Sequence, residues 1–221
     1  MYILHLSDIH YRRELGCRKK ADQGPLDGTN KKHGGVDRAA GPDGYQAMLS
    51  AMQNPLVFLD DCLDRVAGDW ERIGLVVITG DLTEDGTAED YRCLKHHIRK
   101  RIGDIPLVVT LGNHDNKRNF REGWLEEDAD SPCGLKEIGS APYNTIRRLE
   151  DTAVISFDTS VQGVPDGRMD DSQAAWLESV LKAEGKGPSI LVTHHHLLPE
   201  QGQIPPLPES RRMLSLLEHS G

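Results

Sequence analysis

The chain has 221 residues, of which 37% are hydrophobic and 28% are charged, and its formal net charge is −9. This length and balance suit one globular domain covering residues 1–221. No apolar run approaches the roughly 20 residues that span a bilayer, so we expect no membrane-spanning segment. Nucleic acid is disfavoured as a partner because an acidic surface repels its phosphate backbone.

The cysteines and the N-terminal residues indicate the cellular compartment of the protein. The chain has four cysteines, none of which forms a Cys-x-x-Cys pair, so neither a zinc ribbon nor a disulfide framework is expected. The first residues turn polar too early for a signal peptide. We therefore predict a cytoplasmic protein.

Short runs rich in Ile, Leu and Val recur along the chain, and most precede turn residues and a helical pattern. Their density predicts strands that are buried on both faces. The alternation of strands with helices predicts an α/β fold with crossover connections. The predicted strands are Tyr2–Leu6, Leu75–Thr79, Leu107–Leu111, Ala153–Phe157 and Ser189–Thr193, and the predicted helices are Tyr45–Ala67, Thr87–Lys100, Ser172–Ala183 and Glu209–His219.

Two polar stretches interrupt the alternation of strands and helices. Residues 11–44 are rich in Gly, Lys and Arg and lack apolar periodicity, which predicts a long loop inserted after the first strand. Its basic side chains either contact an anionic substrate or form a solvated surface, and the sequence leaves both readings open. Residues 116–145 are also predicted to be irregular.

Polar side chains follow four of the predicted strands. Each cluster alone is compatible with a turn, a helix cap or a solvated loop. Because ligands of open α/β sheets bind at the carboxyl ends of the strands, their joint position is better explained by a metal site. The residues are Asp8 and His10 after the first strand, Asp81 after the second, Asn113, His114 and Asp115 after the third, and His194 and His195 after the last.

The donor types indicate which ions would bind. Oxygen donors combined with imidazole nitrogen suit Mn, Fe, Zn or Co, whereas Ca and Mg prefer oxygen alone. A carboxylate can bridge two ions, and two ions about 3.5–4 Å apart can clamp a phosphate and hold the attacking hydroxide. The donor set therefore fits a dinuclear hydrolase of phosphate esters that uses a metal-bridging hydroxide as the nucleophile.

Four short motifs occur in this order from Met1 to about Pro199, which is nearly the whole chain: Asp8-Ile9-His10, Gly80-Asp81, Gly112-Asn113-His114-Asp115 and His194-His195. Together they resemble the calcineurin-like metallophosphoesterase superfamily. Tyr91 and the Gln173-x-x-Trp176-Leu177 pattern are most similar to its class III cyclic-nucleotide phosphodiesterase branch. The resemblance implies a four-layer αββα sandwich, with two β-sheets between helices.

The resemblance implies a metal ligand at each matching position. Asp8 and His10 would bind the first ion, Asp81 would bridge both ions, and Asn113 and His194 would bind the second.

The resemblance also implies roles beside the metals. His114 would act as a general acid or stabilise charge on the phosphate. Asp115 would orient His114 through a hydrogen bond. His195 is either a substrate contact or a packing residue, and the two readings stay open.

One part of the family pattern is absent. The Gly-His-x-His motif, which gives one histidine to each ion, does not occur in this sequence. We therefore expect a sandwich without its last strands, either as a piece of a longer protein or as a natural variant, with three protein ligands for each ion. An uncovered sheet edge would favour pairing with another copy, as a homo-oligomer. The same absence supports an alternative function, a non-catalytic or regulatory metal-binding module.

The substrate is predicted only by class. Cyclic nucleotides, other small phosphodiesters and simple phosphomonoesters all remain compatible with the motifs, and a diester is favoured.

Overall fold

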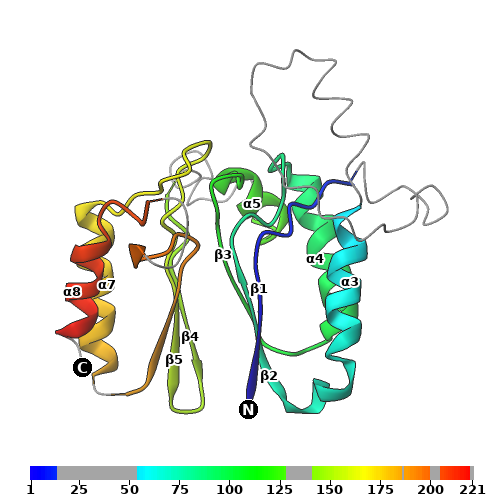
Figure 1. The fold of residues 1–221 in the computed structure, drawn as a ribbon, viewed down its shortest axis with the longest axis horizontal. Coiled ribbons are helices and arrows are strands. Elements are labelled where there is room, and N and C mark those ends of the chain that lie inside the picture. The colour runs from blue at the N-terminus through cyan, green and yellow to red at the C-terminus, as the bar shows by residue number, and fades with distance from the viewer. Residues whose placement is uncertain (14–53, 128–140, 186, 200–204, 220–221) are drawn as a thin grey trace.

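The computed structural model describes residues 1–13, 54–127, 141–185, 187–199 and 205–219. These residues form two β-sheets that face each other, and each sheet is covered by helices on its outer face (Figure 1). The predicted α/β sandwich of four layers is therefore confirmed.

The first sheet is parallel, in the order β1 (Tyr2–Leu6), β2 (Ile73–Thr79) and β3 (Leu107–Thr110). Parallel neighbours need crossover connections, and helix α4 (Ala88–Ile102) provides the one between β2 and β3. The carboxyl ends of all three strands therefore meet at one edge of the sheet, where the predicted metal ligands begin.

The helices outside this sheet begin at polar caps. Asn54 accepts a hydrogen bond from the Leu56 amide at 3.0 Å at the start of α3 (Pro55–Arg65), which is followed by the 3-10 helix η2 (Ala67–Arg72). Asn116 caps α5 (Lys117–Gly123) by accepting from the Asn119 amide at 2.9 Å. Each cap satisfies an amide that the helix itself leaves unpaired.

The second sheet has the order β4 (Thr145–Leu149), β5 (Thr152–Ser156) and β6 (Ser189–Val192). Strands β4 and β5 form an antiparallel hairpin, whereas β5 and β6 are parallel. Helix α7 (Asp171–Glu184), which starts with a capping box of Asp170 and Gln173, crosses between β5 and β6, and α8 (Ser210–Glu218) packs beside it.

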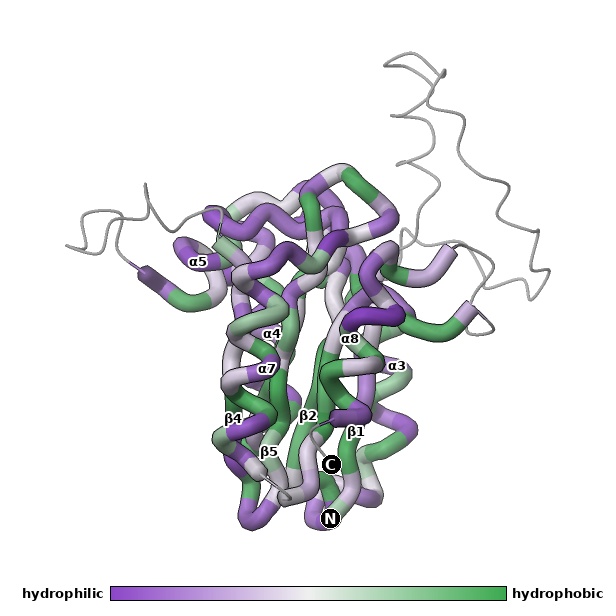
Figure 2. Tube along the Cα trace, turned by 90° about the vertical axis from the view of Figure 1, so that its left-hand side faces the viewer, coloured by the Kyte–Doolittle hydropathy of each residue, from purple (hydrophilic) through white to green (hydrophobic). Residues whose placement is uncertain are grey.

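Apolar side chains fill three layers. One cluster lies between the first sheet and α3, α4 and α5, and another lies between the second sheet and α7 and α8. The third lies between the two sheets and contains Leu75, Val77, Val108, Val154 and Val192. Figure 2 shows the apolar strands in the middle of the molecule and mostly polar loops at the end where the site lies.

The five predicted strands are confirmed within two residues at each end. Helices α4, α7 and α8 are confirmed as well. Helix α3 confirms the later part of the helix predicted over Tyr45–Ala67, and residues 45–53 of that prediction lie outside the described residues. The sequence did not predict β4, and it predicted no helix where α5 lies.

One structural expectation was wrong. Strand β1 is not buried on both faces, because it is an edge strand of its described sheet, and Ile3 is 40% exposed. At the start of the insertion predicted over about residues 11–44, Tyr11 and Arg12 are each 4% exposed, and the Tyr11 amide donates to Leu82 O at 3.0 Å. Residues 14–44 of that predicted loop lie outside the described residues. Among the described helices, none combines the length and apolar character that a bilayer crossing needs.

Candidate metal centre

The loops that follow β1 and β2 run side by side at the strand ends. The Asp8 amide donates to Gly80 O at 3.2 Å, and the His10 amide donates to Asp81 O at 2.9 Å. This pairing brings His10 Nε2 to 3.8 Å from Asp8 Oδ1 and to 3.6 Å from Asp81 Oδ2. The three residues predicted to hold the first ion therefore converge.

The backbone at these positions is unusual. Asp8, His10 and Asp81 have φ angles of 54°, 49° and 47°. Residues with a Cβ rarely adopt this left-handed conformation, which costs on the order of 1–3 kcal/mol each and persists where neighbouring contacts enforce it. Such strain clusters at functional sites, and here it falls on three of the predicted ligands.

A second group forms around the same carboxylate oxygen of Asp81. His194 follows β6 in the second sheet, and its Nε2 lies 3.7 Å from Asp81 Oδ2. Gly80 and Gly112 make this crowding feasible, because a Cβ at Gly80 would strike the His194 ring and one at Gly112 would strike Asp81. Asp81 is thus shared by two groups with metal-ligand spacing, Asp8–Asp81–His194 and His10–Asp81–His114.

Hydrogen bonds fix which nitrogen each histidine presents. The Thr79 carbonyl can only accept, so His194 Nδ1 donates to it at 2.8 Å and leaves Nε2 facing Asp81. His10 Nδ1 lies 2.7 Å from Glu84 Oε2, which likewise leaves Nε2 facing Asp8 and Asp81. Partners of this kind on the far nitrogen are typical of metal-binding histidines.

Glu84 is a site residue that sequence reasoning missed. Its carboxylate contacts His10, and its Oε2 also lies 3.4 Å from His114 Nδ1. The hydrogen bond with His10 is the main reason that the pKa of Glu84 is lowered. The available signal was its position three residues after Asp81, in the same strand-end loop.

Asp115 does not make the contact expected of it. Its carboxylate is fully buried and accepts from the amides of Gly112, Leu82 and Thr83 at 2.9, 3.1 and 3.3 Å and from the Tyr91 hydroxyl. The expected hydrogen bond to His114 is not among the contacts of these described residues. Asp115 instead ties the loop after β3 to the loop after β2, and burial raises its pKa to about 6.

His114 takes its orientation from other residues. Its amide donates to Asp81 Oδ1 at 3.0 Å, and its ring packs edge-on against the His10 ring at 4.8 Å between centroids. Glu84 therefore occupies the place beside His114 that was predicted for Asp115.

Replacing Tyr91 with phenylalanine should destabilise the protein by about 1–3 kcal/mol, because the buried Asp115 carboxylate and the partly buried Asn116 amide would each lose a partner. The Tyr91 hydroxyl donates to Asp115 Oδ1 at 2.9 Å and accepts from the Asn116 amide at 2.9 Å. The change is measured by denaturant unfolding. Tyr143→Phe is the control, since the Tyr143 hydroxyl has no hydrogen bond within the described residues; an equal loss in both variants would contradict this account.

Asn113 lies on the same rim, partly buried, and its main-chain carbonyl accepts from the Gly163 amide at 2.8 Å. His195 is only 7% exposed, and its Nδ1 lies 2.7 Å from Thr159 Oγ1. Burial is the main reason that its pKa falls to about 4, so the ring is neutral. These contacts favour packing as the role of His195.

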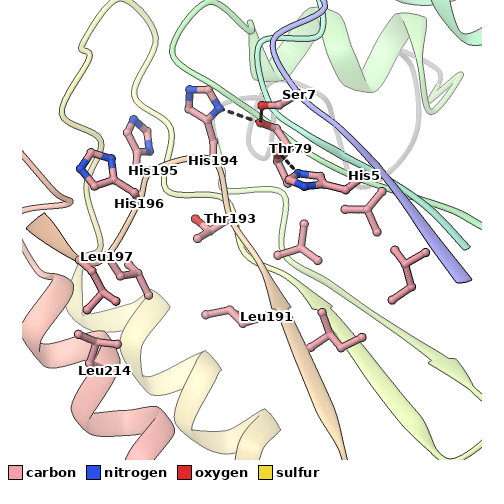
Figure 3. A pocket seen from close by; sticks show the side chains of 15 residues that line it. His5, Ser7, Thr79, Leu191, Thr193, His194, His195, His196, Leu197 and Leu214 are labelled. Carbon is pink, nitrogen blue, oxygen red and sulfur yellow. Dashed lines mark hydrogen bonds between the residues drawn. The ribbon is translucent and has the colours of Figure 1, made fainter. Parts of the chain in front are cut away.

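A cavity of about 640 Å³ opens beside His194, between β1 and β6. Figure 3 shows His5, Ser7 and Thr79 on one wall, with His194 and His195 above and Leu191 below. His5 Nε2 lies 2.8 Å from Thr79 Oγ1, while the Thr79 carbonyl accepts from Ser7 and His194. Thr79 thus joins the end of the first sheet to the histidine from the second.

The electrostatics of the cluster fit a cation. Burial lowers the pKa of His10, but the nearby Asp8 carboxylate, the hydrogen bond to Glu84 and the charge of Asp81 outweigh it and raise the pKa to about 10. The carboxylates around His10 thus hold a positive charge at neutral pH. A divalent ion supplies that charge more effectively, and the mixed carboxylate and imidazole donors suit it.

Comparisons with known proteins agree with this geometry. The family described as Calcineurin-like phosphoesterase matches residues 1–220. The glycerophosphodiester phosphodiesterase GpdQ of Enterobacter lignolyticus is 28% identical over 99% of this chain and 66% of its own length. A probable cyclic nucleotide phosphodiesterase of Rhodococcus erythropolis is 31% identical over 64% of this chain and 44% of its own length. The 3',5'-cyclic adenosine monophosphate phosphodiesterase CpdA of Escherichia coli K12 is 28% identical over 62% of this chain and 45% of its own length.

The chain thus spans between 44% and 66% of the length of these relatives. The family match covers nearly every residue, including all the residues of the two groups with metal-ligand spacing. The chain therefore belongs to the calcineurin-like phosphoesterase family.

Proposed function

We propose that the chain is a phosphodiesterase that binds two divalent ions around Asp81. Asp8, His10 and Asp81 would hold one ion, and Asp81, Asn113 and His194 would hold the other. The observation that carries the proposal is the position of Asp81, whose Oδ2 lies 3.6 Å from His10 Nε2 and 3.7 Å from His194 Nε2.

Two bound ions would polarise the phosphate and activate the attacking water. Residues of the chain would orient the ligands and supply the proton. Glu84 and Thr79 hold His10 and His194 with Nε2 toward the centre. His114, partly exposed beside them, is the proposed proton donor to the departing alcohol, and Asp115 keeps the loop that carries it in place.

The proposed substrate is a small phosphodiester. Two features support it: the relatives are phosphodiesterases of glycerol and cyclic-nucleotide esters by name, and a cavity of about 640 Å³ lies beside His194. Mn, Fe, Zn and Co all remain candidates for the ions. The homo-oligomer and the cytoplasmic location stay predictions of the sequence.

With three proposed ligands for each ion among the described residues, we expect the activity of this chain to depend steeply on added Mn²⁺. The test is hydrolysis of bis(p-nitrophenyl) phosphate by chelator-treated protein as Mn²⁺ is added. The required Mn²⁺ concentration should fall as the pH rises from 6 to 9, because binding displaces the proton that His10 holds with a pKa of about 10.

Two results would contradict this proposal. Binding of two ions with no hydrolysis of any mono- or diester would favour the non-catalytic metal-binding module. Hydrolysis that survives exhaustive chelation would show that the metal centre is not the active site.

A further inference from the structure

A short hairpin of residues 159–168 connects β5 to α7 and lies at the same end of the molecule as the strand-end loops (Figure 1). At its tip, Val161 and Val164 form a β-bridge, and the Val164 amide donates to Val161 O at 2.9 Å. Near its base, the Arg168 amide donates to Thr159 O at 2.8 Å. The hairpin is thus held closed by its own backbone.

Other contacts fix the hairpin to the metal-binding rim. The Gly163 amide donates to the main-chain carbonyl of Asn113 at 2.8 Å, and Asn116 Nδ2 donates to Gln162 Oε1 at 2.9 Å. At the base, a Cβ at Gly167 would strike the buried ring of His195. The tip therefore rests on the loop that carries Asn113, and the base rests on the histidine next to His194.

The tip exposes apolar side chains where polar ones would be better solvated. Val161 is 37% exposed and Val164 is 42% exposed. Leu198, also on a strand-end loop, is 44% exposed; the other large apolar side chains exposed in the described residues lie at the start of β1, on α3 or on β4. Covering such side chains with an organic group is favourable, and a rigid scaffold that carries them beside a site is typical of recognition loops.

We propose that Val161 and Val164 form an apolar wall that contacts one ester group of the substrate and so determines specificity. The wall selects phosphate esters with an aromatic or other apolar face over esters of small polar alcohols such as glycerol. This inference rests on the proposed function, since the phosphate must first be held at the metal centre. Neither valine is assigned to the metal site or to proton transfer.

The test compares two phosphonates that share the anionic group and differ in the organic group. Phenylphosphonate and methylphosphonate are titrated calorimetrically into the Mn²⁺-loaded protein, so the measurement does not depend on turnover. We expect the protein to bind phenylphosphonate about 10-fold more tightly, which is an ordinary value for an apolar contact. The double variant V161S/V164S should lose this preference while its Kd for methylphosphonate stays unchanged.

The control is Ile146→Ser, which removes an apolar side chain of the same exposure, 37%, from β4. It should leave both Kd values unchanged. If V161S/V164S keeps the preference for phenylphosphonate, the wall is refuted and the proposed metal site stands. If neither phosphonate binds the Mn²⁺-loaded parent protein, the proposed function and the wall are both refuted.

Discussion

Replacing Asp81 with asparagine should abolish phosphodiester hydrolysis and lower the metal content more than any other single substitution. Asp81 Oδ2 faces both His10 and His194, so the loss of its charge weakens both groups at once. Asparagine keeps an oxygen that can accept from the His114 amide, as Asp81 Oδ1 does at 3.0 Å. The fold of the loop should therefore survive, whereas Asp81→Ala would remove that contact as well.

Elemental analysis of the purified variant, set beside its unfolding curve, checks this prediction. Asp151→Asn is the matched control, because Asp151 is an exposed carboxylate in the turn between β4 and β5. The control should keep full metal content and activity. Two tightly held ions in Asp81→Asn would show that Asp81 does not join the two groups.

Replacing His114 with alanine should leave the metal content intact and lower kcat by about 10²–10⁴-fold for esters of poor leaving groups, the usual range for a lost general acid. The loss should shrink for a p-nitrophenyl ester, because an acidic leaving group needs no proton. Rates for a series of aryl esters of increasing leaving-group pKa give this dependence.

The same variant also tests the alternative role of His114. Its ring belongs to a group with metal-ligand spacing that includes His10 and Asp81. Loss of one ion in His114→Ala would show that His114 is a ligand instead of an acid. The control is His96→Ala, an exposed histidine on α4, which should change neither quantity.

The sequence predicted those parts of the fold that pattern alone determines. The central strands β2 and β5 are dense in buried apolar residues, and their positions were confirmed. Strand β4 was missed because it contains Arg147 and Arg148 and its three middle residues are exposed. Helix α5 was missed because the Lys117–Gly123 sequence has few apolar residues, so its cap and its packing on α4 define it.

The sequence predicted a set of residues for the candidate site, but it did not predict the contacts among them. Strand-end position was enough to place Asp8 and Asp81 together, because the ends of parallel strands meet at one edge. His194 follows β6 of the second sheet, so its approach to Asp81 depends on how the two sheets pack. Neighbours in sequence were a poor guide to contacts: Asp115 turns inward and is 0% exposed, whereas His114 stays on the rim. Glu84 bonds His10 across 74 positions of sequence, a contact that no local pattern reveals.

Electron paramagnetic resonance of the protein loaded with Mn²⁺ tests the central claim most directly. If Asp81 bridges two ions, their separation of about 3.5–4 Å couples the two spins. We predict that the spectrum of isolated Mn²⁺ is replaced by that of a coupled pair as loading approaches two ions per chain, and that Asp81→Asn prevents this change. A spectrum of isolated, uncoupled Mn²⁺ at every loading would contradict a shared metal centre at Asp81.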